Sequence, residues 1–579
     1  MKDIVDLQGF IREAETIHNE WRQDAKEWVK MERGDQWDEE DKTRLESENR
    51  PVLTFNIIRP FIRLLTGIER KTRYDIKVLP VGEGSDNEVA RFLTNVIKKI
   101  EDDNNAQYVY TEAYHSGLDT GRGWIKVDVS YDRNVYGDII LEEVDSYEIL
   151  VDPYTRKYDL SDCHYLIREL FLTKDDVLET YPDVDSDKLE TAQPDYGDNI
   201  SSGRVCYKFY EIWYKEYKEH WYLVNKETGD IFEIDQKKRR EIEENMTEET
   251  NFELRKILRP EIYYAVISGN EVLEQGPSPY GHNYFPYVPF FCDFRPRFGY
   301  EEKPTWHSVI TDLVDPQKEK NKRISLWVDI MLRFINKGVR YAEGAIRNPD
   351  ALDDMAKASG YRIIMDPAKF NQFEIIHGVA PDASLLNYAS LQDQEIFRIS
   401  GVPPTLYGMQ ETSRESGRSI YLRQQQGFAI LAPFQDNMRL TRKIVASQIL
   451  ALIPRVYTIQ RLVRLMVETE NGNPVLTPEN IEKLKVIYKV KLDPSILLYD
   501  VSISESPSTP TTRQAEFMEM LELLKEGFLP ITPNIIKLIL KTSDISLKNE
   551  LMSILEAEMQ KQQEQAQSQQ IQKAVLGLK

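Results

Sequence analysis

The spacing of apolar residues changes along the chain, and each spacing predicts a different kind of element. From Val89 to Ile100 apolar residues recur every three or four positions, which predicts one buried helix face within a helical pair over 85–118. After Gly123 apolar and polar residues alternate, and a second alternating run follows at 138–144, so a β-hairpin is predicted. Residues 203–275 alternate in the same way. This half of the chain therefore combines helices with strands.

The N-terminal 80 residues predict helices followed by one strand. Residues 1–50 are charged and helical in pattern, with Trp21 and Trp28 spaced to share a helical face. Asn56 can cap a further helix that has a proline in its first turn and runs to about residue 67. Residues 75–81 alternate like a strand.

Prolines and charges predict where regular structure is interrupted. Prolines 277, 279, 286 and 289 predict a stretch without regular elements. The run 235–256 is dominated by charged residues and predicts a solvated loop or helix inserted into the sheet. The segment 560–572 is rich in glutamine and leaves a surface helix and a disordered end equally open.

The second half is more helical. A helix is expected from Trp306 to about Ile335, with Pro316 at a kink or at a junction between two helices. A small α/β module follows, with a helix capped by Asn348 and short strands at YRIIM and FNQFEII. The pattern then predicts a helix at about 384–400, a polar stretch at 409–419 and a long helix at 420–457.

Composition places the chain among globular proteins. It has 579 residues, 41% of them hydrophobic and 29% charged, and a net charge of −22 from 74 basic and 96 acidic residues. No uninterrupted apolar run is long enough for a membrane span, and the N-terminus lacks the apolar core of a secretory signal. Cys163, Cys206 and Cys292 stand far apart, so we expect a reducing compartment and no zinc site.

The motifs of common enzymes are missing from the sequence. GxxxxGK[ST], GxGxxG, HExxH and GxSxG do not occur, and the histidines have no catalytic partner nearby in sequence. The acidic pairs at 175–176 and 353–354 are typical of helix starts or solvated faces rather than of metal ligands. We therefore expect a structural or assembly protein without catalysis, cofactor or metal.

Four blocks of sequence, taken in order, resemble the portal proteins of tailed double-stranded DNA bacteriophages, in particular the short-tailed lineage. The first carries Gly34, Trp37, Arg50, Pro51, Asn56, Pro60, Gly67, Arg70 and Pro80. The others are AYHSGLDTGRGWIKVDVSYD with VDPYTRKYDLSDCHYLI, the block from EIFRISGVPP to NMRLTRKI, and YDVSISESPSTPTTRQAEFMEML. No single block is enough to establish the resemblance. The four blocks occur in the same order as in the family, and together they cover most of the chain.

The resemblance implies an α+β, mainly α-helical portal fold, assembled as a dodecameric ring at the unique capsid vertex. It implies a wing (1–302), a first stem helix (303–336), a clip (337–383), a second stem helix (384–407), a tunnel loop (408–419), a long helix with wing return (420–510) and a crown with a short C-terminal tail (511–579). Only some 20–30 residues of that tail could form a helical barrel, so a long barrel is not expected.

The resemblance also implies partners and sites. The partners are the large terminase subunit, a tail adaptor or head completion protein, the scaffolding and major capsid proteins, and double-stranded DNA passing without sequence preference. The protein is then expected in the virion and, during assembly, in the host cytoplasm. Arg414, Arg418 and Arg423 are the expected DNA-channel residues of the tunnel loop. Asp350, Asp353 and Asp354 are the expected docking residues of the clip.

Two alternatives remain beside the portal hypothesis. A nuclease or ATPase subunit of a packaging machine needs a P-loop or clustered acidic metal ligands, and the sequence shows neither. A capsid or tail adaptor is usually a much shorter chain. The negative charge fits a channel that must not hold DNA tightly, because each neutralised phosphate strengthens binding; it also fits a simple role in solubility.

Overall fold

The computed structural model describes most of the chain. The described residues are 2–71, 75–80, 87–192, 206–225, 231–234, 239, 252–296, 304–335, 338–348, 350, 352, 362–376, 383–402, 417–458, 461, 499–504, 520, 523–524, 535–536 and 539.

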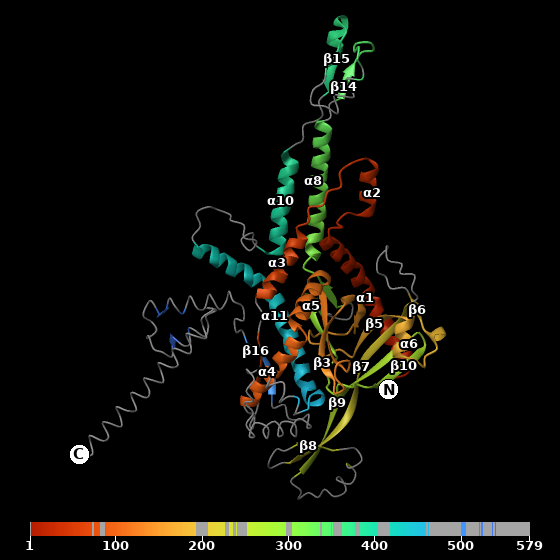
Figure 1. The fold of residues 1–579 in the computed structure, drawn as a ribbon, viewed down its shortest axis with the longest axis vertical. Coiled ribbons are helices and arrows are strands. Elements are labelled where there is room, and N and C mark those ends of the chain that lie inside the picture. Colours follow the sequence, from red (N-terminus) through yellow and green to blue (C-terminus); the bar gives the residue numbers. More distant parts are fainter. Residues whose placement is uncertain are drawn as a thin grey trace, which may run out of the picture. The chain divides into compact units, whose positions relative to one another are not determined.

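These residues form a mixed helix-and-strand protein, the α+β class that was expected (Figure 1). The α-helices are α1 (Ile4–Arg33), α2 (Glu39–Ser47), α3 (Ile58–Lys71), α4 (Asn87–Asp103), α5 (Ala106–Thr120), α6 (Lys174–Thr180), α8 (Val314–Ile335), α10 (Ala383–Ser400) and α11 (Gly417–Val456). Four short 3-10 helices are η1 (Ser146–Glu148), η2 (Ser186–Lys188), η3 (Thr311–Leu313) and η4 (Pro367–Gln372).

The strands are β1 (Asp75–Pro80), β2 (Arg122–Ser130), β3 (Asp138–Val144), β4 (Ile149–Val151), β5 (Tyr165–Thr173), β6 (Thr191–Ala192), β7 (Cys206–Asn225), β8 (Ile231–Ile234), β9 (Phe252–Ser268), β10 (Glu271–Pro277), β11 (Tyr287–Phe291), β12 (Asp293–Arg295), β13 (Thr305–His307), β14 (Gly338–Tyr341), β15 (Phe373–Ile376) and β16 (Tyr499–Ser504).

The chain divides into two compact units. The first comprises Met1–Leu64, Ile100–Thr458 and Tyr488–Ser495, and the second Leu65–Lys99, Ile459–Ile487 and Ile496–Lys579. In the second unit β1 pairs antiparallel with β16. There the predicted apolar face of α4, from Val89 to Val96, is buried.

A seven-stranded antiparallel sheet forms the largest layer of the first unit. Its order is β10-β9-β7-β5-β4, with β6 and β8 also paired to β7. Helix α1 begins where Asp3 accepts a hydrogen bond from the amide of Asp6, and it ends at Gly34, whose φ of 97° suits glycine. Leu7, Ile11 and Ala14 of this helix pack with inward-facing residues of β4, β5, β7 and β9. The predicted N-terminal helix and the buried face shared by Trp21 and Trp28 are thus confirmed.

A three-stranded sheet, ordered β11-β2-β3, packs against α5 and α11. Strands β2 and β3 are the predicted hairpin. Helix α5 approaches β2 so closely that a Cβ on Gly123 would overlap the carbonyl of Ala113, and one on Gly117 would overlap the ring of Phe290. Two glycines therefore set the distance between the helix and the sheet.

The prediction that prolines exclude regular structure after residue 277 is wrong for β11. Pro289 lies in that strand opposite Trp124, and all five residues of the strand are buried. Proline is tolerated because β11 is an edge strand, where the missing N–H can point away from the ladder. The carbonyl of Pro289 accepts a hydrogen bond from Thr441 Oγ1 of α11 at 2.7 Å, so this edge is covered by a helix.

The expected helix from Trp306 begins later than predicted. Residues 305–307 form β13, which pairs with β12, and α8 starts only at Val314. Trp306 is buried among aromatic rings, including Phe294, instead of lying on a helix face. Pro316 occupies the first turn of α8, at the predicted junction between two helices, where its missing N–H costs nothing.

The α/β module between α8 and α10 is confirmed only in part. Strand β15 covers the end of the predicted strand FNQFEII, but the residues before it form η4. YRIIM contributes a single bridge, from Met365 to Ile346, instead of a strand. The side chain of Asn348, expected as a helix cap, accepts a hydrogen bond from the amide of Ile364 and donates to the carbonyl of Arg362.

Candidate functional site: the helix pair and the strap that crosses α8

Helix α8 leads into the β14–β15 module, and α10 leads out of it and packs against α8 (Figure 1). Lys320 of α8 lies 2.5 Å from Asp393 of α10, and only 9% of the lysine side chain is exposed. Helix α10 ends at Gly401, whose φ of 68° stops the helix as predicted. The predicted helices at 384–400 and 420–457 are confirmed, although α11 begins three residues early, at Gly417.

The most buried positions of α8 are polar. Gln317, Asn321, Ser325 and Asp329 follow one another at four-residue intervals and are 0%, 1%, 3% and 7% exposed. Residues spaced by four share one face of a helix. In contrast, Leu332 is 51% exposed. The apolar side of α8, on which its prediction rested, is therefore not the side that the protomer buries most deeply.

An extended segment, residues 50–57 between α2 and α3, crosses the polar face of α8; we call it the strap. The amide of Leu53 donates to Ser325 Oγ at 3.0 Å, that of Phe55 to Asn321 Oδ1 at 2.9 Å and that of Ile57 to Gln317 Oε1 at 3.2 Å. The side-chain amide of Gln317 donates in return to the carbonyl of Phe55 at 2.8 Å.

The regularity of this ladder follows from two matching periods. Two residues of extended chain advance by roughly 6.6 Å. Four residues of an α-helix advance by about 6 Å. Every second amide of the strap therefore meets an acceptor one helical turn further along α8, in the opposite chain direction. Each such bond contributes on the order of 1 kcal/mol net, and a buried amide left without an acceptor costs about 1–3 kcal/mol.

Both ends of the strap are tied by charged or amide side chains. Arg50 Nε lies 3.1 Å from Asp329 Oδ2, and Arg333 of the same helix holds the other oxygen of that carboxylate at 3.0 Å. At the other end, Asn56 Oδ1 accepts from the amide of Arg59 and caps α3, as its sequence position predicted. Asn56 also donates to the carbonyl of Glu32 at the end of α1.

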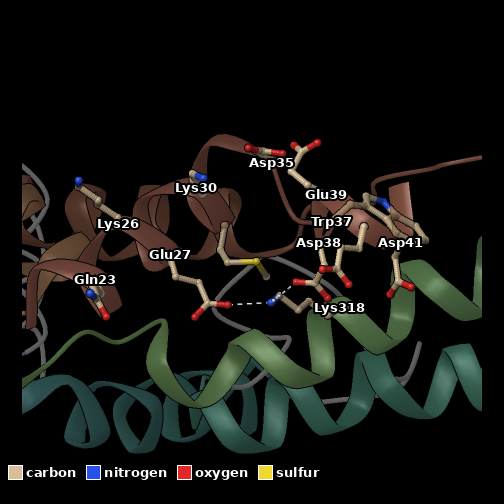
Figure 2. Close-up of a pocket in the computed structure, with 12 residues that line it drawn as sticks. Gln23, Lys26, Glu27, Lys30, Asp35, Trp37, Asp38, Glu39, Asp41 and Lys318 are labelled. Carbon is tan, nitrogen blue, oxygen red and sulfur yellow. Dashed lines mark hydrogen bonds and ion pairs between the residues drawn. The ribbon is translucent and has the colours of Figure 1, made fainter. Parts of the chain in front are cut away.

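The turn between α1 and α2 contacts the neighbouring side of α8. Figure 2 shows Lys318 of α8 between Glu27 and Asp38, with its Nζ 2.7 and 3.0 Å from their carboxylate oxygens. Lys322, one turn further along, lies 2.9 Å from Asp41. Glu27, Asp38, Asp41 and Lys318 border an open pocket of about 630 Å³. Carboxylates are the most frequent groups in the pocket lining, and ion pairs with lysines neutralise part of their negative charge.

The segment before α8 is anchored in a buried cluster around Arg122. The guanidinium lies 3.4 Å from the Trp21 ring and 5.0 Å from the Trp306 ring, and it donates to the carbonyls of Ser146 and Ile149. Ser308, just before η3, donates to a carbonyl at the end of α5. The residues from which α8 starts are thus fixed to α1, α5 and β2.

The structure brings together few of the site residues predicted from sequence. Arg414, Asp353 and Asp354 lie outside the described residues. Arg418 and Arg423 fall in the first turns of α11, where the backbone is described and the side chains are not. Asp350 is exposed. The hydrogen bonds between the strap and α8 were not predicted from the sequence. Their signal in the sequence is a polar residue at every fourth position of the helix: Gln317, Asn321, Ser325 and Asp329.

The described ranges contain no group of three His, Cys, Asp or Glu side chains placed to hold a metal ion. Within the same ranges, no helix has the length and apolar character needed to cross a bilayer.

Comparison with known proteins identifies the family. A family model described as phage P22-like portal protein matches residues 8–576. The chain therefore belongs to the P22-like portal protein family, and the predicted short-tailed-phage lineage is confirmed. It is a portal protein, which stands at the capsid vertex and serves DNA packaging; the match gives no support to a catalytic packaging subunit. No curated protein matches the chain.

Proposed function

We propose that the chain acts as one subunit of a twelve-membered ring that encloses a DNA channel. The observation that carries this proposal is the order α8, β14–β15 module, α10 within a chain of the portal family. Helices α8 and α10 serve as the stem, residues 337–383 as the clip, and residues 408–419 as a tunnel loop facing DNA. The preceding part of the chain serves as the wing, and residues beyond 510 as the crown.

The ring has a structural role without catalysis. The packaging motor, through the large terminase subunit, docks on the clip, and a tail adaptor replaces it when packaging ends. Scaffolding and major capsid proteins are partners of the ring, which assembles in the host cytoplasm and stands at the portal vertex of the virion. A net charge of −22 supports a channel in which DNA slides, because weak neutralisation of phosphates keeps friction low.

Native mass measurement tests the ring. Twelve copies of a 67.7-kDa chain, closed into one cyclic ring, give about 0.8 MDa. A particle image of the same sample should show twelvefold symmetry around a hole. A stable monomer or dimer as the sole species, at micromolar concentration, would contradict the proposal.

A further inference from the structure

The strap is fixed to α8 by hydrogen bonds to its backbone, and its own side chains are not fully buried. Six of its eight residues are half-buried and none is fully buried, and Phe55 is 44% exposed. Half-buried side chains provide less hydrophobic stabilisation than the fully buried side chains of the core, because the stabilisation scales with the apolar area removed from water. The strap is therefore held through the acceptors that α8 presents to its amides.

The surface under the strap can be exposed to water at low cost. Gln317, Asn321, Ser325 and Asp329 are buried in the closed arrangement, yet each carries groups that water can satisfy. Lifting the strap exchanges hydrogen bonds between protein groups for hydrogen bonds to water. An interface of interdigitated apolar side chains would lose far more on opening, because its burial is what stabilises it.

The two ends of the strap differ in how firmly they are attached. The Asn56 end caps α3 and is bonded to α1, so it acts as an anchor. The other end follows Asn49, which has a positive φ of 54°, and it is closed by the pair between Arg50 and Asp329. Arg333 already satisfies part of the Asp329 carboxylate, so this carboxylate keeps a cationic partner when Arg50 leaves.

We propose that residues 50–55 of the strap are released from α8, beginning at the Arg50–Asp329 end, while Asn56 stays anchored. Opening uncovers the polar strip from Asn321 to Asp329 and removes the contacts of the strap to this part of α8, while the ion pairs of Lys318 and Lys322 with the N-terminal helices remain. The β14–β15 module at the end of α8 is then linked to the body through a contact that can be broken and remade. The device belongs to a single chain and does not depend on ring formation.

Hydrogen exchange on the full-length protein tests this proposal. Peptides covering residues 50–57 should exchange faster than peptides of β2, because local opening needs less free energy than global unfolding. Asp329→Asn weakens the pair with Arg50 that holds the end of the strap. It should speed hydrogen exchange of the strap several-fold and leave the exchange rate of β2 unchanged. Ser325→Ala removes the acceptor of the Leu53 amide and should speed exchange there by about tenfold. Ser325→Thr keeps a hydroxyl and should restore the original rate.

A matched control is Ser447→Ala. Ser447 is half-buried on α11, far from the strap in sequence, and donates to a carbonyl of its own helix, so its loss should leave the strap unchanged. If the strap exchanges as slowly as β2 in the unaltered protein, it opens only with the whole fold and the proposal is overturned. Equal acceleration of the strap and β2 by Asp329→Asn would overturn it as well, because that pattern reports general destabilisation.

Discussion

Nη1 of Arg122 lies 2.9 Å from Nδ1 of His18, and both side chains are fully buried. Because arginine keeps its proton, Nδ1 must accept, while Nε2 lies 2.7 Å from the amide nitrogen and 3.2 Å from the carbonyl oxygen of Val151. A protonated His18 would place a second positive charge against the guanidinium. The pair thus requires a neutral histidine inside the cluster that anchors the start of α8.

This pair predicts a loss of stability in mild acid. Burial, and then the charge of Arg122, lower the pKa of His18 well below its ordinary value of 6.5. Below about pH 6.5 the unfolded chain binds a proton that the folded chain does not, so the free energy of unfolding falls as pH falls, by up to about 1.4 kcal/mol per pH unit. The free energy of unfolding stops falling only when the pH is below the pKa of His18 in the folded protein.

The variant His18→Gln should weaken this pH dependence. Glutamine keeps an acceptor for Arg122 and an amide donor for Val151, but it does not titrate. Thermal unfolding midpoints measured from pH 7.5 to 5 should fall less steeply in the variant than in the unaltered protein. Parallel curves for the two proteins would show that His18 does not carry the effect.

Gly123→Ala should destabilise the first unit strongly. A methyl group there meets the backbone of Ala113, which cannot move without displacing α5 from β2. Overpacking of this kind costs about 1–3 kcal/mol or more, and we expect a lower unfolding midpoint or insoluble protein. Gly9→Ala is the matched control, because nothing lies within 4 Å of its Cβ in the interior of α1. It should stabilise by about 0.5–1 kcal/mol; equal behaviour of the two variants would refute the close approach.

The tunnel-loop proposal predicts a defect in holding DNA. Arginine suits phosphate contact because its planar fork is always charged. Arg414→Ala with Arg418→Ala should leave ring formation intact and lower the DNA content of capsids after packaging stops. Arg414→Lys with Arg418→Lys keeps the charge and should retain more DNA. Full retention by the alanine variant would mean that these arginines serve the loop itself, for example by pairing with Glu411 and Glu415.

The clip proposal predicts a defect in docking. Asp353→Lys with Asp354→Lys should weaken binding of the motor or adaptor to isolated rings, because an acidic face becomes basic, while the rings still form. Binding is measured by co-sedimentation with each partner. Glu179→Lys with Asp187→Lys makes the same charge change at exposed positions elsewhere and should not affect docking. Undiminished docking by the clip variant would exclude this acidic face as the contact.

Local patterns predicted the elements that local chemistry determines. The apolar period of α4, the cap at Asn56 and the stop at Gly401 all depend on near neighbours in the chain, and all are confirmed. Strand β11 could not be predicted, because Pro289 is acceptable only at an edge, and the order of strands is set by distant partners.

The site was predicted less well, for a related reason. A prediction from amphipathic spacing assumes that the buried face of α8 is apolar. In the structure the buried face is polar, because the amides of the strap donate hydrogen bonds to its side chains. That pairing joins residues some 270 positions apart in sequence. The cluster around Arg122 likewise unites residues 18, 122 and 306, which no short motif connects.

The pairing of β1 with β16 has a consequence for synthesis of the chain. Residues 75–80 leave the ribosome roughly 400 residues before their partner, residues 499–504. At 5–20 residues per second, β1 waits about 20–80 seconds with an unpaired edge. Exposed edges invite pairing with other chains. A nascent portal subunit is therefore vulnerable to mispairing throughout most of its translation, and the second unit can be completed only near the end.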